Sequence, residues 1–438
     1  MISGANIDNA GALPSIALFG HEYEVVWTAK TSSATDAIQA RRLTGTGKTT
    51  GGLVTVVGGW PSLQSDPTIL SYSGQRLVAF AGHQNSGAYT TGAEYYTTSA
   101  NGGTWTLNAG SLSGADGADH DTGNAVFNAS GTMVTGMAED QGVRYHVGVS
   151  ASNPAPGTDP LTSTTGNSSY FPGLGLDQKS HTVWAAWFSN DGAGGHDGVW
   201  AQPILPNPGS RVHAPGSSAS GGTTARGVEQ DLSAASRVGG GVYTAYVTPL
   251  SRSVDVWKMG STKALATFKD LRGPSSAVVA PAPGGRIWVY WRDGQGWHAA
   301  RSNKRATRFG RTISLAAPTG MQVGLDIAGN AAAGPLEAVA TEITSGGQNR
   351  VIATQVLPRL TVHSSSRTVA RHHSFTVSVT DVGDPVKGAK VRFAGASYRT
   401  GARGTVKITV SGKTSRGKHE VTVSARGYHV AGTTIKVT

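Results

Sequence analysis

An apolar strand that ends on a large side chain recurs along the first 359 residues, and this repeat constrains the fold more than any other feature. Each copy precedes a polar loop and, in most cases, a recognisable second strand. A period of about 45 to 59 residues separates successive copies, whereas consecutive β-sandwich domains would repeat nearer every ~100 residues. The seven copies, of which the last is the weakest, occupy residues 23–27, 77–80, 133–137, 183–187, 242–246, 287–291 and 336–340.

A single sheet of this size cannot bury both faces, so the repeats are expected to pack around an axis as an all-β propeller. The chain has 61 Gly and only 14% charged residues, which argues against a helical bundle, and its 10 Trp argue against disorder. The absence of cysteine excludes disulfides, thiolate metal sites and cysteine nucleophiles. We count seven blades, and six or eight would follow if one unit were misread. They are expected at residues 13–62, 66–113, 123–165, 169–215, 228–271, 275–320 and 323–358.

Residues 99–105 (Ser-Ala-Asn-Gly-Gly-Thr-Trp) resemble the Asp-box turn of sialidase-type propellers. Asn101 stands where that family has Asp, and the gap between Gly and Trp is one residue short. The resemblance implies that a polar side chain pins a β-hairpin turn and that the Trp packs between strands. Sialidases also carry an Arg in the first blade, but residues 13–16 (Leu-Pro-Ser-Ile) contain none. The resemblance therefore implies the fold and not sialidase activity.

From residue 360 the sequence alternates apolar and polar residues over several short runs, which predicts a small antiparallel β-sandwich. The Gly-bearing turns between residues 384 and 428 resemble those of bacterial immunoglobulin-like domains and of the sandwiches appended to secreted carboxypeptidases and carbohydrate-active enzymes. The resemblance implies an extracellular accessory module. We therefore predict a propeller over residues 1–359 and an immunoglobulin-like sandwich over residues 360–438.

The net charge of +11 is concentrated in the predicted sandwich. That segment has 13 Lys and Arg against three acids, whereas the first 359 residues have 24 against 23. Such a charge can attract a polyanion, namely teichoic acid, acidic polysaccharide or nucleic acid, or can serve only to solvate the surface. Aromatic residues are sparse there, so nucleic acid is an unlikely partner. The candidate polyanion-binding residues are Lys387, Lys390, Arg392 and Arg403.

In a propeller, the loops inside each blade and the loops between blades share one face, where ligands bind near the axis. Neighbouring carboxylates raise one another's pKa and histidine titrates near neutrality, so a group of both can perform acid–base catalysis. The candidate catalytic residues on this face are His83, Asp119, His120, Asp121, Glu139 and Asp140. The candidate substrate-binding residues are Arg144, Asp191, His196 and Arg292. Alternatively, Asp116, Asp119 and Asp121 could bind a structural Ca²⁺ or simply form turns.

Two classes of function fit these features, because fold alone does not decide function. One is a secreted carbohydrate-active enzyme, either a glycoside hydrolase or a polysaccharide lyase, with the sandwich as an anchor. The other is a non-catalytic extracellular protein for glycan binding, adhesion or surface assembly. Both take a polysaccharide or cell-surface glycan as partner. No apolar run reaches the ~18 residues of a membrane span. The N-terminus lacks a signal-peptide pattern, so the protein is either cytoplasmic or a mature secreted form with an added Met. The composition favours the second alternative.

Overall fold

The structure is a computed structural model, and its chain divides into two compact units. The first unit consists of residues up to Ala299 together with Thr312–Gln355, and the second of Ala300–Arg311 together with Val356–Thr438. The predicted division at residue 360 remains a prediction. The described residues are 14–32, 34–72, 74–84, 93–108, 121–139, 142–147, 159–160, 168–190, 198–217, 232–248, 252–315, 321–344 and 349–438.

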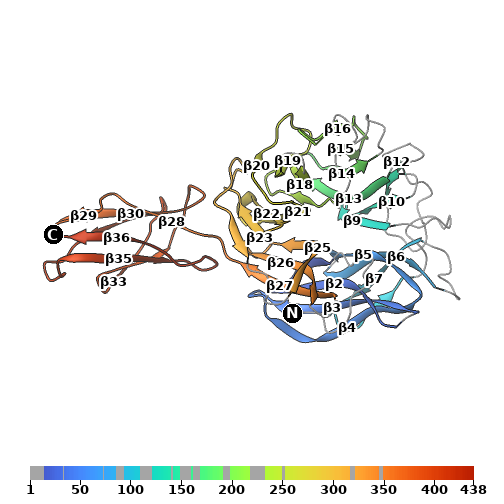
Figure 1. The fold of residues 1–438 in the computed structure, drawn as a ribbon, viewed down its shortest axis with the longest axis horizontal. Coiled ribbons are helices and arrows are strands. Elements are labelled where there is room, and N and C mark those ends of the chain that lie inside the picture. Colours follow the sequence, from blue (N-terminus) through green and yellow to red (C-terminus); the bar gives the residue numbers. More distant parts are fainter. Residues whose placement is uncertain are drawn as a thin grey trace. The chain divides into compact units, whose positions relative to one another are not determined.

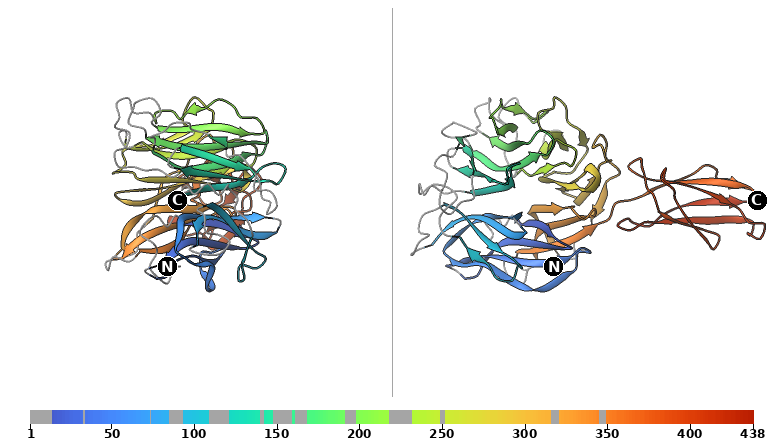
Figure 2. Two further views of the ribbon diagram at one scale, coloured as in Figure 1. Left: turned by 90° about the vertical axis from the view of Figure 1, so that its right-hand side faces the viewer. Right: turned by 180° about the vertical axis from the view of Figure 1, so that it is seen from behind.

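Seven antiparallel sheets follow one another along the chain and stand in a ring, which confirms the predicted β-propeller (Figures 1 and 2). Blade 1 contains β1 (Ser15–Phe19), β2 (Glu22–Lys30), β3 (Asp36–Thr44) and β4 (Thr49–Trp60). Blade 2 contains β5 (Ser62–Tyr72), β6 (Gln75–His83), β7 (Ala93–Ser99) and β8 (Thr106–Leu107). Blade 3 contains β9 (Asp121–Phe127), β10 (Met133–Glu139), β11 (Gly142–Val147) and β12 (Asp159–Pro160).

The remaining four blades repeat this order of strands. Blade 4 contains β13 (Ser168–Asp177), β14 (Thr182–Asn190), β15 (Gly198–Leu205) and β16 (Val212–His213). Blade 5 contains β17 (Ala234–Ser236), β18 (Val242–Thr248), β19 (Ser253–Lys258) and β20 (Ala266–Phe268). Blade 6 contains β21 (Ser276–Ala282), β22 (Arg286–Asp293), β23 (Gly296–Arg301) and β24 (Ile313–Leu315), with the short 3₁₀ helix η1 (Pro283–Gly285) between β21 and β22. Blade 7 contains β25 (Met321–Asn330), β26 (Leu336–Thr344) and β27 (Asn349–Val356).

All seven recurring apolar segments form the second strand of a blade, as the repeat predicts. These strands lie between an inner and an outer neighbour, and their side chains pack against adjacent blades, so they carry the most continuous apolar sequence. Trp27, Trp187 and Trp288, for example, are fully buried. The predicted aromatic and apolar pattern thus reflects packing between blades.

Blade 7 packs against blade 1 and closes the ring. One apolar cluster joins Ile16, Tyr23 and Val25 of blade 1 to Val339 and Val351 of blade 7. The Asn330 side chain also donates a 3.1 Å hydrogen bond to the Ile16 carbonyl. Among the described strands, each of these two blades is built from consecutive segments, so side-chain packing rather than an exchanged strand holds the closure.

The second unit contains two sheets that enclose an apolar core. One sheet contains β28 (Thr361–Ser364), β30 (Ser374–Asp381), β31 (Asp384–Pro385) and β34 (Thr405–Thr409). The other has the order β29 (Thr368–Val369), β36 (Ala431–Val437), β35 (Gly417–Ser424), β32 (Lys390–Phe393) and β33 (Ala396–Arg399). Within the described residues, no helix is long and apolar enough to cross a membrane.

The segment Ala300–Arg311 belongs to the second unit through polar contacts. The Arg301 guanidinium forms a 3.0 Å ion pair with Asp381, and Lys304 N–H donates a 2.7 Å hydrogen bond to the Asp384 carboxylate. Arg308 Nε donates a 3.0 Å hydrogen bond to the Val382 carbonyl. Two of the three acids between residues 360 and 438 are therefore engaged by this segment.

Candidate functional site

The first strands of the blades surround a cavity of about 420 Å³ at the centre of the first unit. Its wall is mainly apolar, with a few hydroxyl and amide side chains. Several of these are already used between blades: Ile69 N–H donates to Ser15 Oγ at 3.1 Å, and Val279 N–H donates to Ser233 Oγ at 2.8 Å. The innermost strand of a blade has backbone N–H and C=O groups without a partner strand on one edge. These serine hydroxyls accept hydrogen bonds from two of those N–H groups. The cavity wall is thus chiefly a means of joining blades.

Glu342 lies near the end of β26 and is the most unusual acid of the described residues. Its side chain is fully buried, and neither carboxyl oxygen accepts a hydrogen bond from a described residue. Burial raises the pKa of this carboxyl to about 7. The next residue, Ile343, is 37% exposed, so β26 reaches solvent one residue beyond the carboxyl. The buried Glu342 carboxyl therefore lies one residue away from an exposed position of β26.

Two further charged residues, Asp326 of β25 and Arg292 of β22, belong to the same pair of blades as Glu342. Asp326 lies in the irregular stretch of β25 between Val323 and Ile327, and Val323 pairs with Glu342. Thr341 Oγ1 donates a 3.4 Å hydrogen bond to the Asp326 carboxylate. Burial raises the pKa of Asp326, while this hydrogen bond and the charge of Arg292 lower it.

Arg292 is a half-buried cation at the end of β22. Its Nη1 donates a 3.2 Å hydrogen bond to Ser275 Oγ. Burial lowers the pKa of its guanidinium, and the charges of Asp293 and Asp326 raise it. Asp293 also lies 3.0 Å from His298 Nε2. The Arg292 charge therefore acts on two carboxyls, one of which already has a histidine neighbour.

Tyr290 lies two residues before Arg292 and is almost fully buried. Burial and the neighbouring Glu342 both raise the pKa of its hydroxyl above the usual range. The phenol is thus held in its neutral form beside the Glu342 carboxyl. We refer to Asp326, Glu342, Arg292 and Tyr290 as the blade 6/7 site.

A second buried acid, Glu337, lies at the other end of β26. Gln355 Nε2 donates hydrogen bonds to Glu337 Oε2 at 3.3 Å and to the Gly45 carbonyl at 2.7 Å, linking blade 7 to blade 1. Burial raises the pKa of Glu337 to about 7, although the Gln355 hydrogen bond lowers it in part. Gly47 has φ +75°, and a Cβ there would clash with Glu337 Oε1. The site of Glu337 is thus built into the closure of the ring.

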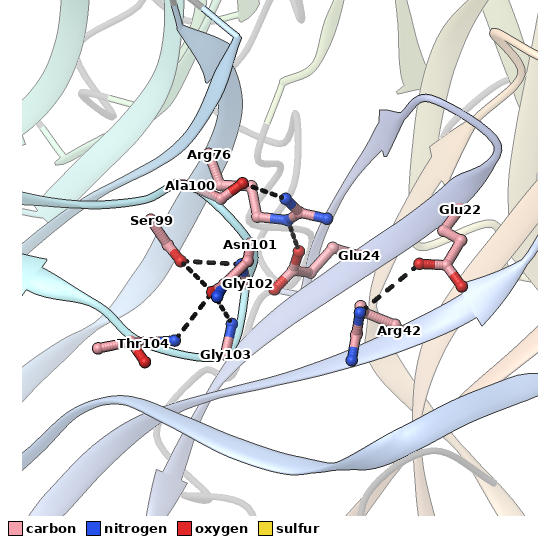
Figure 3. Close-up of polar contacts among 10 residues, drawn as sticks. All are labelled: Glu22, Glu24, Arg42, Arg76, Ser99, Ala100, Asn101, Gly102, Gly103 and Thr104. Atoms are coloured by element: carbon pink, nitrogen blue, oxygen red, sulfur yellow. Dashed lines mark hydrogen bonds and ion pairs between the residues drawn. The ribbon is translucent and has the colours of Figure 1, made fainter.

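The Asp-box-like turn joins β7 to β8 and packs against blade 1 (Figure 3). Asn101 Oδ1 accepts hydrogen bonds from Gly103 N–H at 2.8 Å and Thr104 N–H at 3.2 Å. Gly102, at φ +73°, leaves room for the Glu24 carboxylate, which accepts a hydrogen bond from Arg76 Nε. The polar side chain pins the turn as expected, and the surrounding contacts are structural.

Most of the predicted site on blades 2 and 3 is outside the described residues. His83 ends β6 and is half-buried, and Arg292 is the last residue but one of β22. Asp121, Glu139 and Arg144 fall in β9, β10 and β11, but their side chains are not among those described. The predicted residues wholly outside the described ranges are Asp116, Asp119, His120, Asp140, Asp191 and His196. These assignments, including the alternative Ca²⁺ site, stay predictions.

The predicted polyanion-binding residues occupy different places in the second unit. Lys390 and Arg392 lie on β32, whereas Lys387 and Arg403 are exposed residues outside the strands. Within the described ranges, no group of three or more His, Asp or Glu side chains could hold a metal ion.

Glu342, Asp326 and Glu94 were not among the residues predicted from the sequence. Glu94 is a fully buried acid on β7 that accepts a 2.9 Å hydrogen bond from Thr135 Oγ1. A signal for two of the acids was present, because Glu337 and Glu342 interrupt the apolar second strand of blade 7. An acid in a strand that is buried on both faces indicates a functional or pairing role.

Comparisons with known proteins find only distant structural likeness. No family model matches the chain, and no curated protein matches it. A protein of unknown function from Dyadobacter fermentans DSM 18053 is 13% identical with a TM-score of 0.46, over 80% of this chain and 96% of that chain. A thermostable family-43 glycoside hydrolase is 10% identical with a TM-score of 0.40, over 72% and 98%. The Aleuria aurantia lectin in complex with Fucα1-6GlcNAc is 11% identical with a TM-score of 0.40, over 80% and 97%.

Proposed function

We propose that this protein is an extracellular glycoside hydrolase that acts at the blade 6/7 site, with Glu342 as the proton donor. The observation that carries the proposal is a buried carboxyl whose two oxygens accept no hydrogen bond from a described residue. An ionised carboxylate in such a place would be strongly unfavourable, so the group keeps its proton near neutrality. A carboxyl that is still partly protonated at pH 7 is what a glycosidase needs to protonate the leaving oxygen.

Asp326 supplies the second carboxyl of the proposed reaction. Burial raises the pKa of Asp326 overall, and the Thr341 hydroxyl and the Arg292 charge, which Glu342 lacks, counteract this in part and favour the ionised form. An ionised carboxylate can act as a nucleophile or activate water. The proposal requires the two carboxyls to lie at the separations of roughly 5 to 10 Å that glycosidases use.

Hydrolysis fits this site better than β-elimination by a lyase. A lyase would need a tyrosine or histidine that readily gives up a proton near the uronate carboxylate. Tyr290 is the tyrosine at the site, and its pKa is raised rather than lowered. Arg292 could neutralise a uronate, but the neighbouring phenol is a poor base.

A panel of neutral and acidic polysaccharides, assayed for released reducing ends, tests this proposal. Glu342→Gln and Asp326→Asn should abolish release, whereas Glu337→Gln should retain it. Glu337 is a closely matched control, since it lies on the same strand, is equally buried and also has a pKa of about 7. Glycan binding without release of reducing ends by the wild-type protein would instead support a non-catalytic glycan-binding propeller.

A further inference from the structure

The five-stranded sheet of the second unit has one buried and one outward face. Val391, Phe393, Val421, Val423 and Ile435 point into the core. Because side chains alternate along a strand, the residues between them point outward. The charged residues on the outward face are Lys390, Arg392, Arg399, Lys418, Lys436 and Glu420, and we call this set the cationic face.

Two like-charge pairs stand directly opposite each other on the cationic face. Lys390 pairs with Arg399 across β32 and β33, and Lys418 pairs with Lys436 across β35 and β36. Like charges in directly opposed positions destabilise a sheet. All of residues 356–438 are described, and within them none of these four cations forms an ion pair. The arrangement therefore opposes stability of the free sheet and favours a bound anion.

The acids of the second unit do little to neutralise this face. Asp381 pairs with Arg301, and Asp384 accepts the Lys304 N–H. Glu420 is the single acid on the face, and it is positioned beside Gly432, where an added Cβ would lie 3.2 Å from its Oε1. Five cations therefore share the face with one carboxylate.

The spacing of the cations fits an extended ligand. Lys418 lies six residues along β35 from Ser424, which pairs with Lys390. At about 3.4 Å per residue, the two like-charge pairs stand roughly 20 Å apart, with Arg392 between them. A small anion could not bridge this distance, whereas an extended polymer with repeated charges could.

Hydroxyl groups share the face with the cations, and aromatic rings do not. Ser397, Thr422 and Thr434 have the same orientation, because they pair with Arg392 or Glu420. Phe393 is buried in the core, so no ring on the face could stack on a base. We propose that the cationic face binds an extended acidic polysaccharide, with the carboxylates of a polyuronate on the cations and its hydroxyls on the Ser and Thr side chains.

Affinity electrophoresis of the full chain through polygalacturonate, at salt from about 50 to about 200 mM, tests this proposal. The variant K390Q/R392Q/K418Q/K436Q should bind about tenfold or more weakly and lose part of its salt dependence. The control K407Q/K413Q/R416Q/R426Q removes the same charge from exposed positions outside the cationic face, and should bind nearly as well as the wild type.

Stability measurements separate lost binding from lost folding. Because the like-charge pairs oppose folding, the face variant should melt at the wild-type temperature or above it. The single variant Lys418→Gln removes one pair and should show the same behaviour with a smaller loss of binding. Equal weakening in face and control variants would overturn the proposal, because net charge would then suffice. Equal affinity for duplex DNA at the same charge concentration would also overturn it. The result does not depend on the hydrolase proposal.

Discussion

Glu337 and Glu342 lie five residues apart on one strand, yet their surroundings differ. Glu337 is held by Gln355 and by the space at Gly47, where blade 7 meets blade 1. Glu342 has no hydrogen-bond partner among the described residues and lies beside Tyr290 of blade 6. Because five is odd, the two side chains point to opposite faces of β26 and therefore to different blades. Two carboxyls with the same raised pKa can therefore differ in surroundings, one joining two blades and the other having no hydrogen-bond partner among the described residues.

Activity should separate the two glutamates most strongly. Removal of a general acid lowers the rate by about 10²- to 10⁴-fold, so Glu342→Gln should lose nearly all reducing-end release. Glu337→Gln should stay within about threefold of the wild type, because it alters only the ring closure. Steady-state kinetics on the best substrate of the panel measures both. Equal losses of activity in the two variants would show that Glu342 has no catalytic role distinct from that of Glu337.

The pH dependence of stability should reveal both acids. Each has a folded-state pKa of about 7, above the ordinary glutamate value of 4.5. Their stabilising protons are fully present below pH 4.5, and the free energy of unfolding falls as pH rises through about 7. Each carboxyl contributes on the order of 3 kcal/mol to this fall. Urea unfolding at several pH values should show a smaller fall in Glu337→Gln and in Glu342→Gln than in the wild type.

Gly47→Ala should disturb only the ring closure. The alanine would adopt an unfavourable positive φ and press on the Glu337 carboxyl, costing about 2 kcal/mol or more. Gly20→Ala is the control, since Gly20 has φ +62° and nothing within 4 Å of an added Cβ. Thermal unfolding should therefore show a larger decrease for Gly47→Ala than for Gly20→Ala. Similar decreases would mean that the contact with Glu337 carries no energy.

The fold was largely predictable from the sequence, whereas the blade 6/7 site was not. The repeat identified the second strand of each blade, because strands buried between blades carry continuous apolar residues. Arg292 was predicted as a substrate-binding residue from its place in an expected loop within a blade. The predicted seventh strand ended at Ala340, whereas β26 continues to Thr344 and takes in Glu342. Which face of β26 meets which blade depends on the closed ring, and no local pattern encodes it.

The charge of the second unit was predictable, but its arrangement was not. Alternation placed Lys390 and Arg392 on one face of a strand. Strand order and register were needed to bring Lys418 opposite Lys436 and to separate Lys387 and Arg403 from them. The composition of the second unit therefore predicts a polyanionic partner. The register of its strands determines which cations lie together on one face.

A carbon-13 NMR titration of the glutamate carboxyls tests the central claim most directly, because it observes both acids of β26 without requiring turnover. We expect two carboxyl signals that titrate near pH 7, one absent in Glu337→Gln and the other absent in Glu342→Gln. Adding an oligosaccharide from the best substrate should shift only the Glu342 signal. Titration of both groups near pH 4.5, or a response of Glu337 rather than Glu342 to the oligosaccharide, would contradict the account.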